Sequence, residues 1–418
     1  MLSLRLIIVC LILPLVVNAG NPEDYRFPRE PGTTEDGFPL ALSGVPITKT
    51  PVIANPGVKV KDYPEHYIPG RETLSDDEMR VTACGSGGPA PLRISQGAAC
   101  FLVQLGNGDT FIFDIGPGTV GNLFALGVHP SELDKVFITH LHLDHLGSIF
   151  PLFDAMGWAR NTPLQLWGSS GFTPELGIKA FANHVRQASE WHIQNKQNIL
   201  PKGGMTIVAN EFDYSKFSPE NPRQLVYEEN GVKIYAFPIV HALAGSVGYR
   251  LEWNDLTFVY VSDSQPSRFE AEQGKGADIF VNEVFPYAEE FAHYGRLPIE
   301  SAEGVLEEHT TAEQLGNIFS IAKPRLGAGM HYTLDDELTD PLFERWSANY
   351  SGPLLLMQDL TTVNVTSEYI VVRQTKADLL AWPPPPKPPE EGVDMSKGVP
   401  TKAVTPDWLT ETLLLNED

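Results

Sequence analysis

Residues 139–148 read Thr-His-Leu-His-Leu-Asp-His-Leu-Gly-Ser, and they constrain the fold more than any other stretch. They follow a short apolar run whose β-branched and aromatic residues suit a buried strand. His140 and His142 point to the same side of an extended chain, whereas Asp144 and His145 come where the chain turns toward a helix. Packing alone gives no reason to crowd groups that repel once protonated, so this run predicts a metal centre.

The His-x-His-x-Asp-His run resembles the signature of the metallo-β-lactamase-fold hydrolases. The resemblance implies an α/β fold, a four-layer αββα sandwich in which loops at one edge hold one or two metal ions, usually zinc. Because that superfamily covers many reactions, the motif predicts the fold and a metal site but does not identify the substrate.

Composition divides the 418-residue chain into four parts. Residues 1–19 combine Arg5, an apolar stretch and small residues at the end, which predicts a signal peptide and an exported protein, periplasmic or extracellular. Residues 20–78 are rich in Pro, Gly and charge and predict an extended arm. The resemblance implies a catalytic domain at residues 79–376, and the composition of residues 377–418 predicts a Pro-rich, acidic tail. The arm and the tail are candidate contacts for a homo-oligomer, and no later stretch suits a membrane anchor.

Apolar runs and helical spacing place the elements of the catalytic domain. A glycine-rich turn at 85–89 should lie beside the active edge of the sheet. The main expected strands cover 79–84, 98–105, 111–116, 163–167, 232–240, 256–262, 354–357 and 363–372, and the main expected helices cover 120–126, 146–159, 172–197 and 312–321.

Cys84 and Cys100 are the cysteines outside the expected signal peptide. They fall on segments that could form neighbouring antiparallel strands. A disulfide between them is compatible with export, and two buried free thiols are equally compatible with the sequence.

Further ligands are expected at the ends of later strands. His241 precedes a Gly-Tyr-Arg strand, as in the third-histidine segment of the branch that includes tRNase Z and the zinc arylsulfatases. Asp263 and His331 also follow apolar runs. The resemblance implies one metal on His140, His142 and His241, a second on Asp144, His145 and His331, and Asp263 joining them with a bridging hydroxide. Asp114, at the end of its own strand, takes the role of orienting the histidine loop.

The same branch carries a His-Glu-Ala-Thr segment and a later His-Ser-Thr segment, whose Glu and His act as an acid/base unit. This chain has Asn282-Glu283 and His309-Thr310-Thr311 at the matching places, so that Asn282 departs from the pattern. The resemblance therefore assigns His309 as general acid and Glu283 as its orienting partner. Asp144 is expected to be a catalytic residue as well as a metal ligand.

The net charge of the chain limits the class of substrate that we expect. The chain has 30 Lys and Arg against 53 Asp and Glu, a formal charge of -23, which would repel a polyanion. The basic, Gly- and Pro-rich RNA-binding arm of a tRNase Z is not visible between residues 168 and 232. We therefore expect an exported dinuclear hydrolase of small esters, arylsulfatase-like or phosphodiesterase-like, with no nucleic-acid partner. Zinc is the first choice of metal, and manganese or iron fits the same ligands.

Two other functions agree with the same residues. One is a β-lactamase or lactonase, against which the Glu283 and His309 pair speaks only mildly. The other is a metal-stabilised binding protein without turnover, against which the retention of every ligand type speaks.

Overall fold

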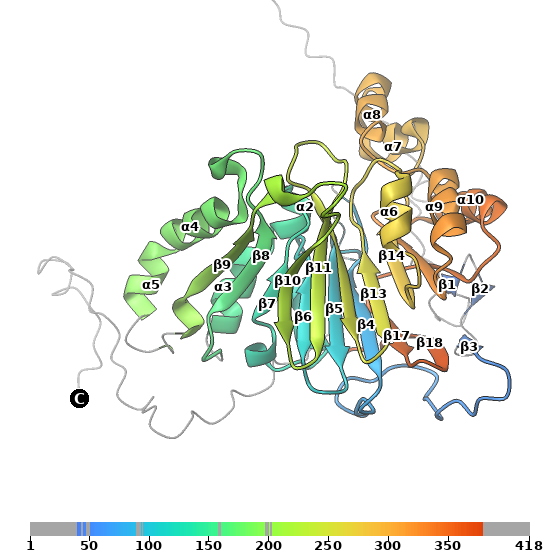
Figure 1. The fold of residues 1–418 in the computed structure, drawn as a ribbon, viewed down its shortest axis with the longest axis horizontal. Helices are drawn as coiled ribbons and strands as arrows, with labels where there is room; N and C mark the ends of the chain where they lie inside the picture. Colours follow the sequence, from blue (N-terminus) through green and yellow to red (C-terminus); the bar gives the residue numbers. More distant parts are fainter. Residues whose placement is uncertain are drawn as a thin grey trace, which may run out of the picture.

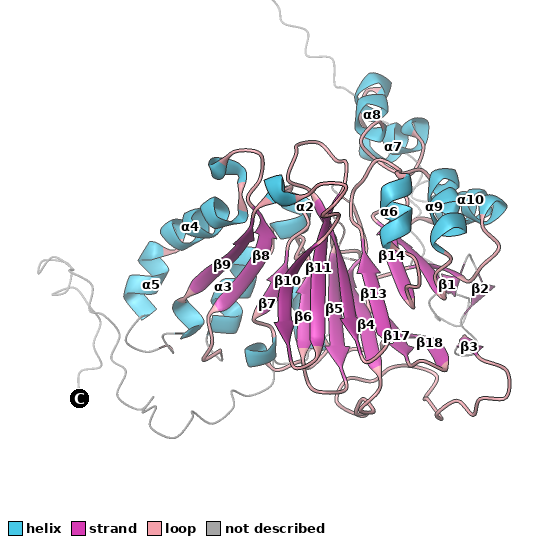
Figure 2. Ribbon diagram, viewed as in Figure 1, coloured by secondary structure: helices cyan, strands magenta, loops and turns pink. Residues whose placement is uncertain are grey.

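The computed structural model describes residues 40–42, 45–46, 51–88, 93, 95–157, 160–196, 200 and 203–378. Two β-sheets pack face to face, and helices cover the outer face of each sheet (Figures 1 and 2). This is the αββα sandwich that the histidine run predicted.

The first sheet has nine strands in the order β3-β18-β17-β4-β5-β6-β7-β8-β9. Its strands β6 to β9 run parallel, and the remaining pairs are antiparallel. The bounds are β3 Val52–Ala54, β4 Met79–Gly85, β5 Cys100–Leu105, β6 Thr110–Phe113, β7 Lys135–Phe137, β8 Leu164–Ser169, β9 Ile207–Phe212, β17 Thr361–Val365 and β18 Tyr369–Gln374.

The second sheet has seven strands in the sequential order β10 to β16. Strands β10 to β13 form an antiparallel meander, and β13 to β16 run parallel. The bounds are β10 Gln224–Glu229, β11 Val232–Pro238, β12 Val247–Trp253, β13 Leu256–Tyr260, β14 Ile279–Glu283, β15 Leu326–Met330 and β16 Leu354–Leu356. A separate pair, β1 Leu40–Leu42 and β2 Val45–Pro46, precedes both sheets in the chain.

The period-two pattern of buried strands explains the layers. In β5, Phe101 and Val103 point into the core between the sheets, whereas Cys100 and Leu102 point to the helices outside. The first sheet is covered by residues of α1 Val120–Ala125, α3 Ile149–Gly157 and α4 Ile178–Ala188, and the second by residues of α6 Arg268–Gln273, α9 Ala312–Ala322 and α10 Asp336–Asn349.

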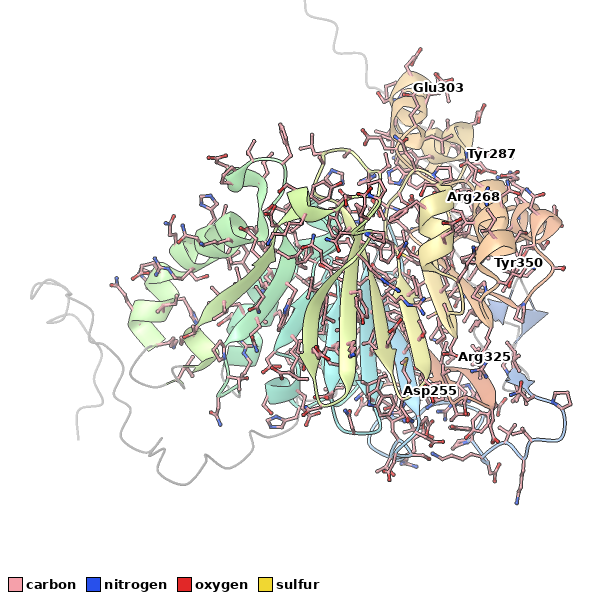
Figure 3. All side chains as sticks on the ribbon, viewed as in Figure 1. Asp255, Arg268, Tyr287, Glu303, Arg325 and Tyr350 are labelled. Carbon is pink, nitrogen blue, oxygen red and sulfur yellow. The ribbon has the colours of Figure 1, made fainter. Side chains whose placement is uncertain are left out.

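The remaining described helices are eight residues long or shorter. They are α2 Leu143–Leu146, α5 Glu190–Lys196, α7 Ala288–Gly295 and α8 Ile299–Leu306, with 3-10 turns η1 Pro130–Glu132, η2 Pro174–Leu176, η3 Gly203–Met205 and η4 Tyr214–Lys216. Helices α7 and α8 project beyond the rest of the fold at the top of Figure 1, and Figure 3 places Tyr287 and Glu303 on this projection.

Three expected elements differ from the structure. The helix expected at 146–159 is two helices, α2 and α3, and that expected at 172–197 is divided into η2, α4 and α5. The expected final strands belong to different sheets, since β16 ends the second sheet while β17 and β18 return to the first.

The arm expected at 20–78 lies along the domain where it is described. Strand β3 pairs with β18, and Tyr67 forms a bridge with Thr375. Cys84 and Cys100 are buried free thiols, which decides between the two alternatives left open by the sequence. The expected signal peptide and residues 379–418 of the expected tail lie outside the described residues, and none of the described helices has the length and hydropathy to cross a bilayer.

Candidate metal centre

The candidate ligands meet at one edge of the sandwich, where strands of both sheets end. His140 and His142 follow β7, and α2 carries Asp144 and His145. His241, Asp263 and His331 follow β11, β13 and β15 of the second sheet. The site is therefore assembled from both sheets.

The first group of ligand atoms comes from His140, His142, His241 and Asp263, all within 4.8 Å of one another. Nδ1 of His142 lies 3.3 Å from Nε2 of His241, and Oδ2 of Asp263 lies 3.7 Å from that same Nε2 atom. Oδ2 of Asp263 is 3.9 Å from Nε2 of His140. Three imidazoles thus surround one carboxylate oxygen.

The second group comes from Asp144, His145, Asp263 and His331. Oδ1 of Asp263 lies 3.1 Å from Nε2 of His145 and 3.2 Å from Nε2 of His331. Oδ2 of Asp144 is 3.2 Å from each of the same two nitrogens. Asp263 therefore presents one oxygen to each group, the arrangement that a ligand shared by two cations requires.

The chemistry of these atoms fits divalent cations. The Nε2 atoms of His140 and His145 are buried without hydrogen-bond partners among the described residues. Burial lowers the pKa of His140, and the neighbouring imidazoles lower it further, so that the neutral ring required of a metal ligand is favoured. Nitrogen and carboxylate ligands without a thiolate suit zinc, and also manganese or iron.

The carboxylates of the second group attract positive charge. Burial would lower the pKa of His331, but Asp263 and Asp144 outweigh this effect and raise it to about 10. Burial would raise the pKa of Asp263, yet the surrounding imidazoles hold it well below its usual value. A cation bound here would supply the positive charge that protons otherwise supply.

Asp114, for which the resemblance implied an orienting role, contacts the histidine loop at several points. It is fully buried. Its Oδ1 accepts the backbone N–H of Thr139 at 2.8 Å, and its Oδ2 lies 2.9 Å from Nδ1 of His145. The hydroxyl groups of Thr139 and Tyr260 also donate to Oδ2. Holding Nδ1 in this way turns Nε2 of His145 toward the ligand group.

Glu283 and His309 form a buried pair beside the second group. Oε2 of Glu283 lies 2.6 Å from Nδ1 of His309, while Oε1 accepts the backbone N–H groups of Ser264 and Thr310. Burial would lower the pKa of His309, but the Glu283 carboxylate outweighs this and raises it. These two side chains also lie within 4.8 Å, atom to atom, of Asp263 and His331.

The family model of the metallo-beta-lactamase superfamily matches residues 96–300, which include the histidine run, Asp263 and Glu283. The chain carries a metallo-beta-lactamase superfamily domain. Ribonuclease Z of Mycobacterium avium (strain 104) is 25% identical over 300 residues, covering 69% of this chain and 98% of that protein. Ribonuclease Z of Brevibacillus brevis is 27% identical over 273 residues, covering 57% and 80%.

Two solved structures share the fold of this metallo-beta-lactamase domain. The metallo-beta-lactamase fold protein YhfI from Bacillus subtilis has a TM-score of 0.51 at 20% identity, covering 69% of this chain and all of that chain. Human tRNase Z, short form, has a TM-score of 0.50 at 16% identity, covering 68% and 98%. Because relatives are ribonucleases, the expectation of no nucleic-acid partner receives no support from them.

Several residues of the metallo-beta-lactamase site carry no sequence signal. The ring of Phe285 stacks on His309, with centroids 4.1 Å apart, yet in the sequence it looks like an ordinary core residue. Asp359 accepts the backbone N–H and the hydroxyl of Ser86, whose carbonyl accepts the N–H of His331 at 2.7 Å. The glycine-rich turn at 85–89 thus does lie beside the site, at least through residue 88, as the sequence indicated.

Proposed function

We propose that this protein is a metal-dependent hydrolase that cleaves a small phosphodiester or related ester. The observation that carries the proposal is the position of the Glu283–His309 pair next to two ligand groups that share Asp263. Divalent cations held by these groups supply Lewis-acid activation of water and of the scissile ester. The side chains of the protein supply the ligands, their orientation and a proton donor.

His309 is the proton donor in this proposal. Its Nδ1 is held by Glu283, which leaves Nε2 to pass a proton to the departing oxygen. Because the carboxylate raises the pKa of His309, the ring stays protonated further toward neutral pH than an isolated imidazole. The stacked ring of Phe285 fixes the plane of the imidazole.

A small diester is favoured over a polynucleotide by charge. The formal charge of -23 repels a polyanion, and no Lys or Arg lines the cavity next to His140 and His142. RNA cleavage is the second candidate, because relatives that match most of the domain are ribonuclease Z enzymes. A transfer-RNA precursor and bis-para-nitrophenyl phosphate, assayed side by side, separate the two candidates.

The decisive test compares the wild type with His309→Ala at measured metal content. We expect both proteins to bind the same amount of metal, because His309 belongs to neither of the two proposed ligand sets. The variant should lose on the order of 10²-fold in kcat on diesters with poor leaving groups and much less on para-nitrophenyl diesters. Equal rates on poor leaving groups would remove the general-acid role, and a fully metallated wild type inactive on all esters would refute the hydrolase.

The export of the protein and the choice of zinc are parts of the same proposal. Export is supported by the apolar stretch and the small residues in positions 1–19. Cell fractionation with N-terminal sequencing of the mature protein tests it, and retention of the leader in a cytosolic fraction would contradict it. Zinc is supported by ligand chemistry, and elemental analysis of protein purified without added metal tests it.

A further inference from the structure

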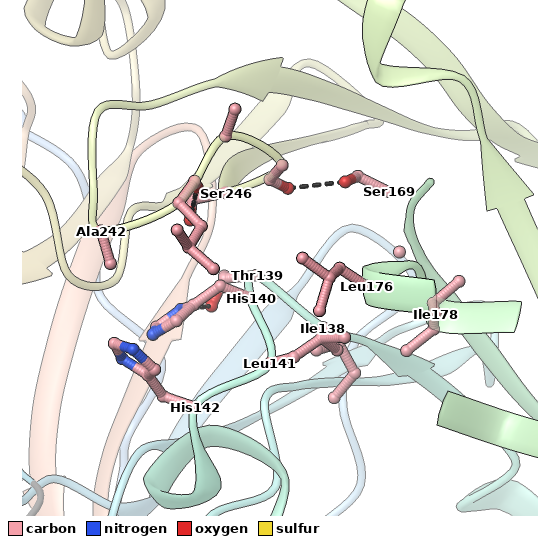
Figure 4. A pocket seen from close by; sticks show the side chains of 14 residues that line it. Ile138, Thr139, His140, Leu141, His142, Ser169, Leu176, Ile178, Ala242 and Ser246 are labelled. Carbon is pink, nitrogen blue, oxygen red and sulfur yellow. Dashed lines mark hydrogen bonds between the residues drawn. The ribbon is translucent and has the colours of Figure 1, made fainter. Parts of the chain in front are cut away.

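A cavity of about 190 Å³ opens directly beside His140 and His142 (Figure 4). Its walls come from the histidine loop, from the segment joining β8 to α4, and from the loop after His241. In Figure 4 the two imidazoles lie at one end, and Leu176 and Ile178 lie at the other. Half of its fourteen lining residues are aliphatic: Ile138, Leu141, Leu176, Ile178, Ala242, Leu243 and Ala244.

The hydroxyl groups of this lining are already engaged by the protein. Ser169 donates to the carbonyl of Gly245 at 2.6 Å and accepts the N–H of Gly171. Ser246 donates to the carbonyl of His241, and the Thr139 hydroxyl donates to Asp114. Away from the two imidazoles, a polar group entering the cavity would therefore give up water without gaining a side-chain partner, which disfavours it.

Close backbone contacts fix the walls of the cavity. A Cβ atom on Gly245, whose φ is +126°, would lie 2.9 Å from Cα of Gly171, and one on Gly168 would lie 2.8 Å from Cβ of Ile178. Gly245 lets the loop after His241 approach the segment that joins β8 to α4, and Gly168 lets β8 approach α4. Ile178 is buried, whereas Leu176 and Leu243 are 41% and 60% exposed at the mouth. The cavity is thus preformed, with apolar surface left for a ligand to cover.

We propose that this cavity is the subsite for an uncharged, apolar substituent of the substrate, up to the size of one substituted aromatic ring. This inference rests on the proposed hydrolase function. An apolar cavity of roughly 150 Å³ can hold benzene, so the volume here admits a single ring with small substituents. The missing basic side chains exclude a second phosphate as its occupant.

The cavity receives the group that stays on phosphorus. A leaving oxygen must come within about 3 Å of its proton donor. His309 does not line the cavity; it packs on Phe285 next to His331. The leaving group therefore points toward the Glu283–His309 pair, and the retained substituent occupies the apolar cavity by His140 and His142.

Two phosphonate monoesters test this assignment, because they share charge and leaving group and differ only in the retained substituent. They are the para-nitrophenyl esters of phenylphosphonic and methylphosphonic acid. We expect kcat/KM to be at least about 10-fold higher for the phenyl compound, the scale of discrimination by apolar pockets. Leu243→Ser and Leu176→Ser should each reduce this ratio several-fold. Leu225→Ser, at a similarly exposed leucine outside the cavity lining, should keep the wild-type ratio.

A wild-type ratio near one, or a ratio unchanged in both cavity variants, would overturn the subsite. Calorimetry of the metal-loaded protein with phenylphosphonate and methylphosphonate gives a readout without turnover. Tighter binding of phenylphosphonate, weakened by Leu243→Ser, supports the subsite even if neither ester is hydrolysed, a result that would count against the proposed function alone. Equal affinities would overturn the subsite while hydrolysis, if seen, leaves the proposed function standing.

Discussion

Glu270 is a buried acid that the proposed reaction does not use. Burial raises its pKa to about 8, although Asn282 donates to its carboxyl group. Asn282 in turn accepts the backbone N–H of Glu283 at 2.7 Å. This connection gives a physical role to Asn282, the residue that departs from the tRNase Z pattern: it links the general-acid pair to a carboxyl group that remains protonated near neutral pH.

We predict that Glu270→Gln raises the free energy of unfolding relative to wild type, and that this gain is larger at pH 9 than at pH 5. Between pH 4.5 and 8 the unfolded chain loses the Glu270 proton while the folded protein keeps it, so wild-type stability falls as pH rises through this window. Glutamine mimics the protonated acid and removes this loss, on the order of a few kcal/mol. Urea unfolding of chelator-treated protein at both pH values measures the difference. Glu272→Gln, at a half-exposed position on the same helix, should show no such trend.

At the level of single residues, the sequence was enough to nominate the His and Asp side chains that are closely spaced or that follow an apolar run. All seven nominated ligand side chains come together in the structure, and Asp114 contacts their loop as implied. That they bind metal stays a prediction. Phe285, Asp359 and Glu270 could not be nominated, because a buried phenylalanine or a single acid acquires its role only from the residues that the fold places beside it.

Helices α7 and α8 lie close to the proposed proton donor His309. They are inserted between Glu283 and His309 and pack around a small apolar cluster of Phe285, Ala288, Phe291 and Ala302. The ring centroids of Phe291 and Phe285 are 4.9 Å apart, and Phe285 stacks on His309. The helix pair thus supports the proposed proton donor, His309, through the ring of Phe285.

We predict that Phe291→Ala lowers kcat on esters with poor leaving groups and leaves metal content unchanged. Removing the ring deletes apolar contacts worth about 3 kcal/mol in a buried cluster and loosens the support of Phe285. Kinetics with good and poor leaving groups, together with metal analysis, measure the effect. Ile299→Ala, at a 37%-exposed position on α8, is the control and should resemble wild type. Equal losses on both kinds of leaving group would show general damage instead.

Periodicity located most elements but not their breaks. The helix expected at 146–159 begins earlier in the structure, since α2 starts at Leu143 and already carries Asp144 and His145. Within this early turn, the backbone of Asp144 lies so close to Gly116 that a Cβ atom on Gly116 would be 2.1 Å from the carbonyl oxygen of Asp144. Such tertiary contacts override local pattern and are not visible in the sequence.

For the molecule as a whole, the ligand groups join the two sheets. His140, His142, Asp144 and His145 come from the first sheet, and His241, Asp263 and His331 from the second. Cations bound by both sets would therefore oppose separation of the sheets.

We predict that chelation lowers Tm by roughly 10 °C, the effect of losing about 4 kcal/mol of binding at a thousandfold excess over Kd. Differential scanning calorimetry before and after metal removal measures it. Asp263→Ala, which lacks the shared carboxylate, should show little response to the chelator. An unchanged wild-type Tm would contradict a cation that bridges the two sheets.

After β16 of the second sheet, the chain returns to the first sheet as β17 and β18. Strand β17 pairs with β4, and Val365 lies opposite Met79. Residues nearly three hundred positions apart must therefore meet before the nine-stranded sheet is complete. A nascent chain emerging from the ribosome has no way to close this sheet until its residues near 374 have left the exit tunnel. Completion of the nine-stranded sheet is thus a late step in folding, and truncation near residue 360 would leave the edge of β4 unpaired.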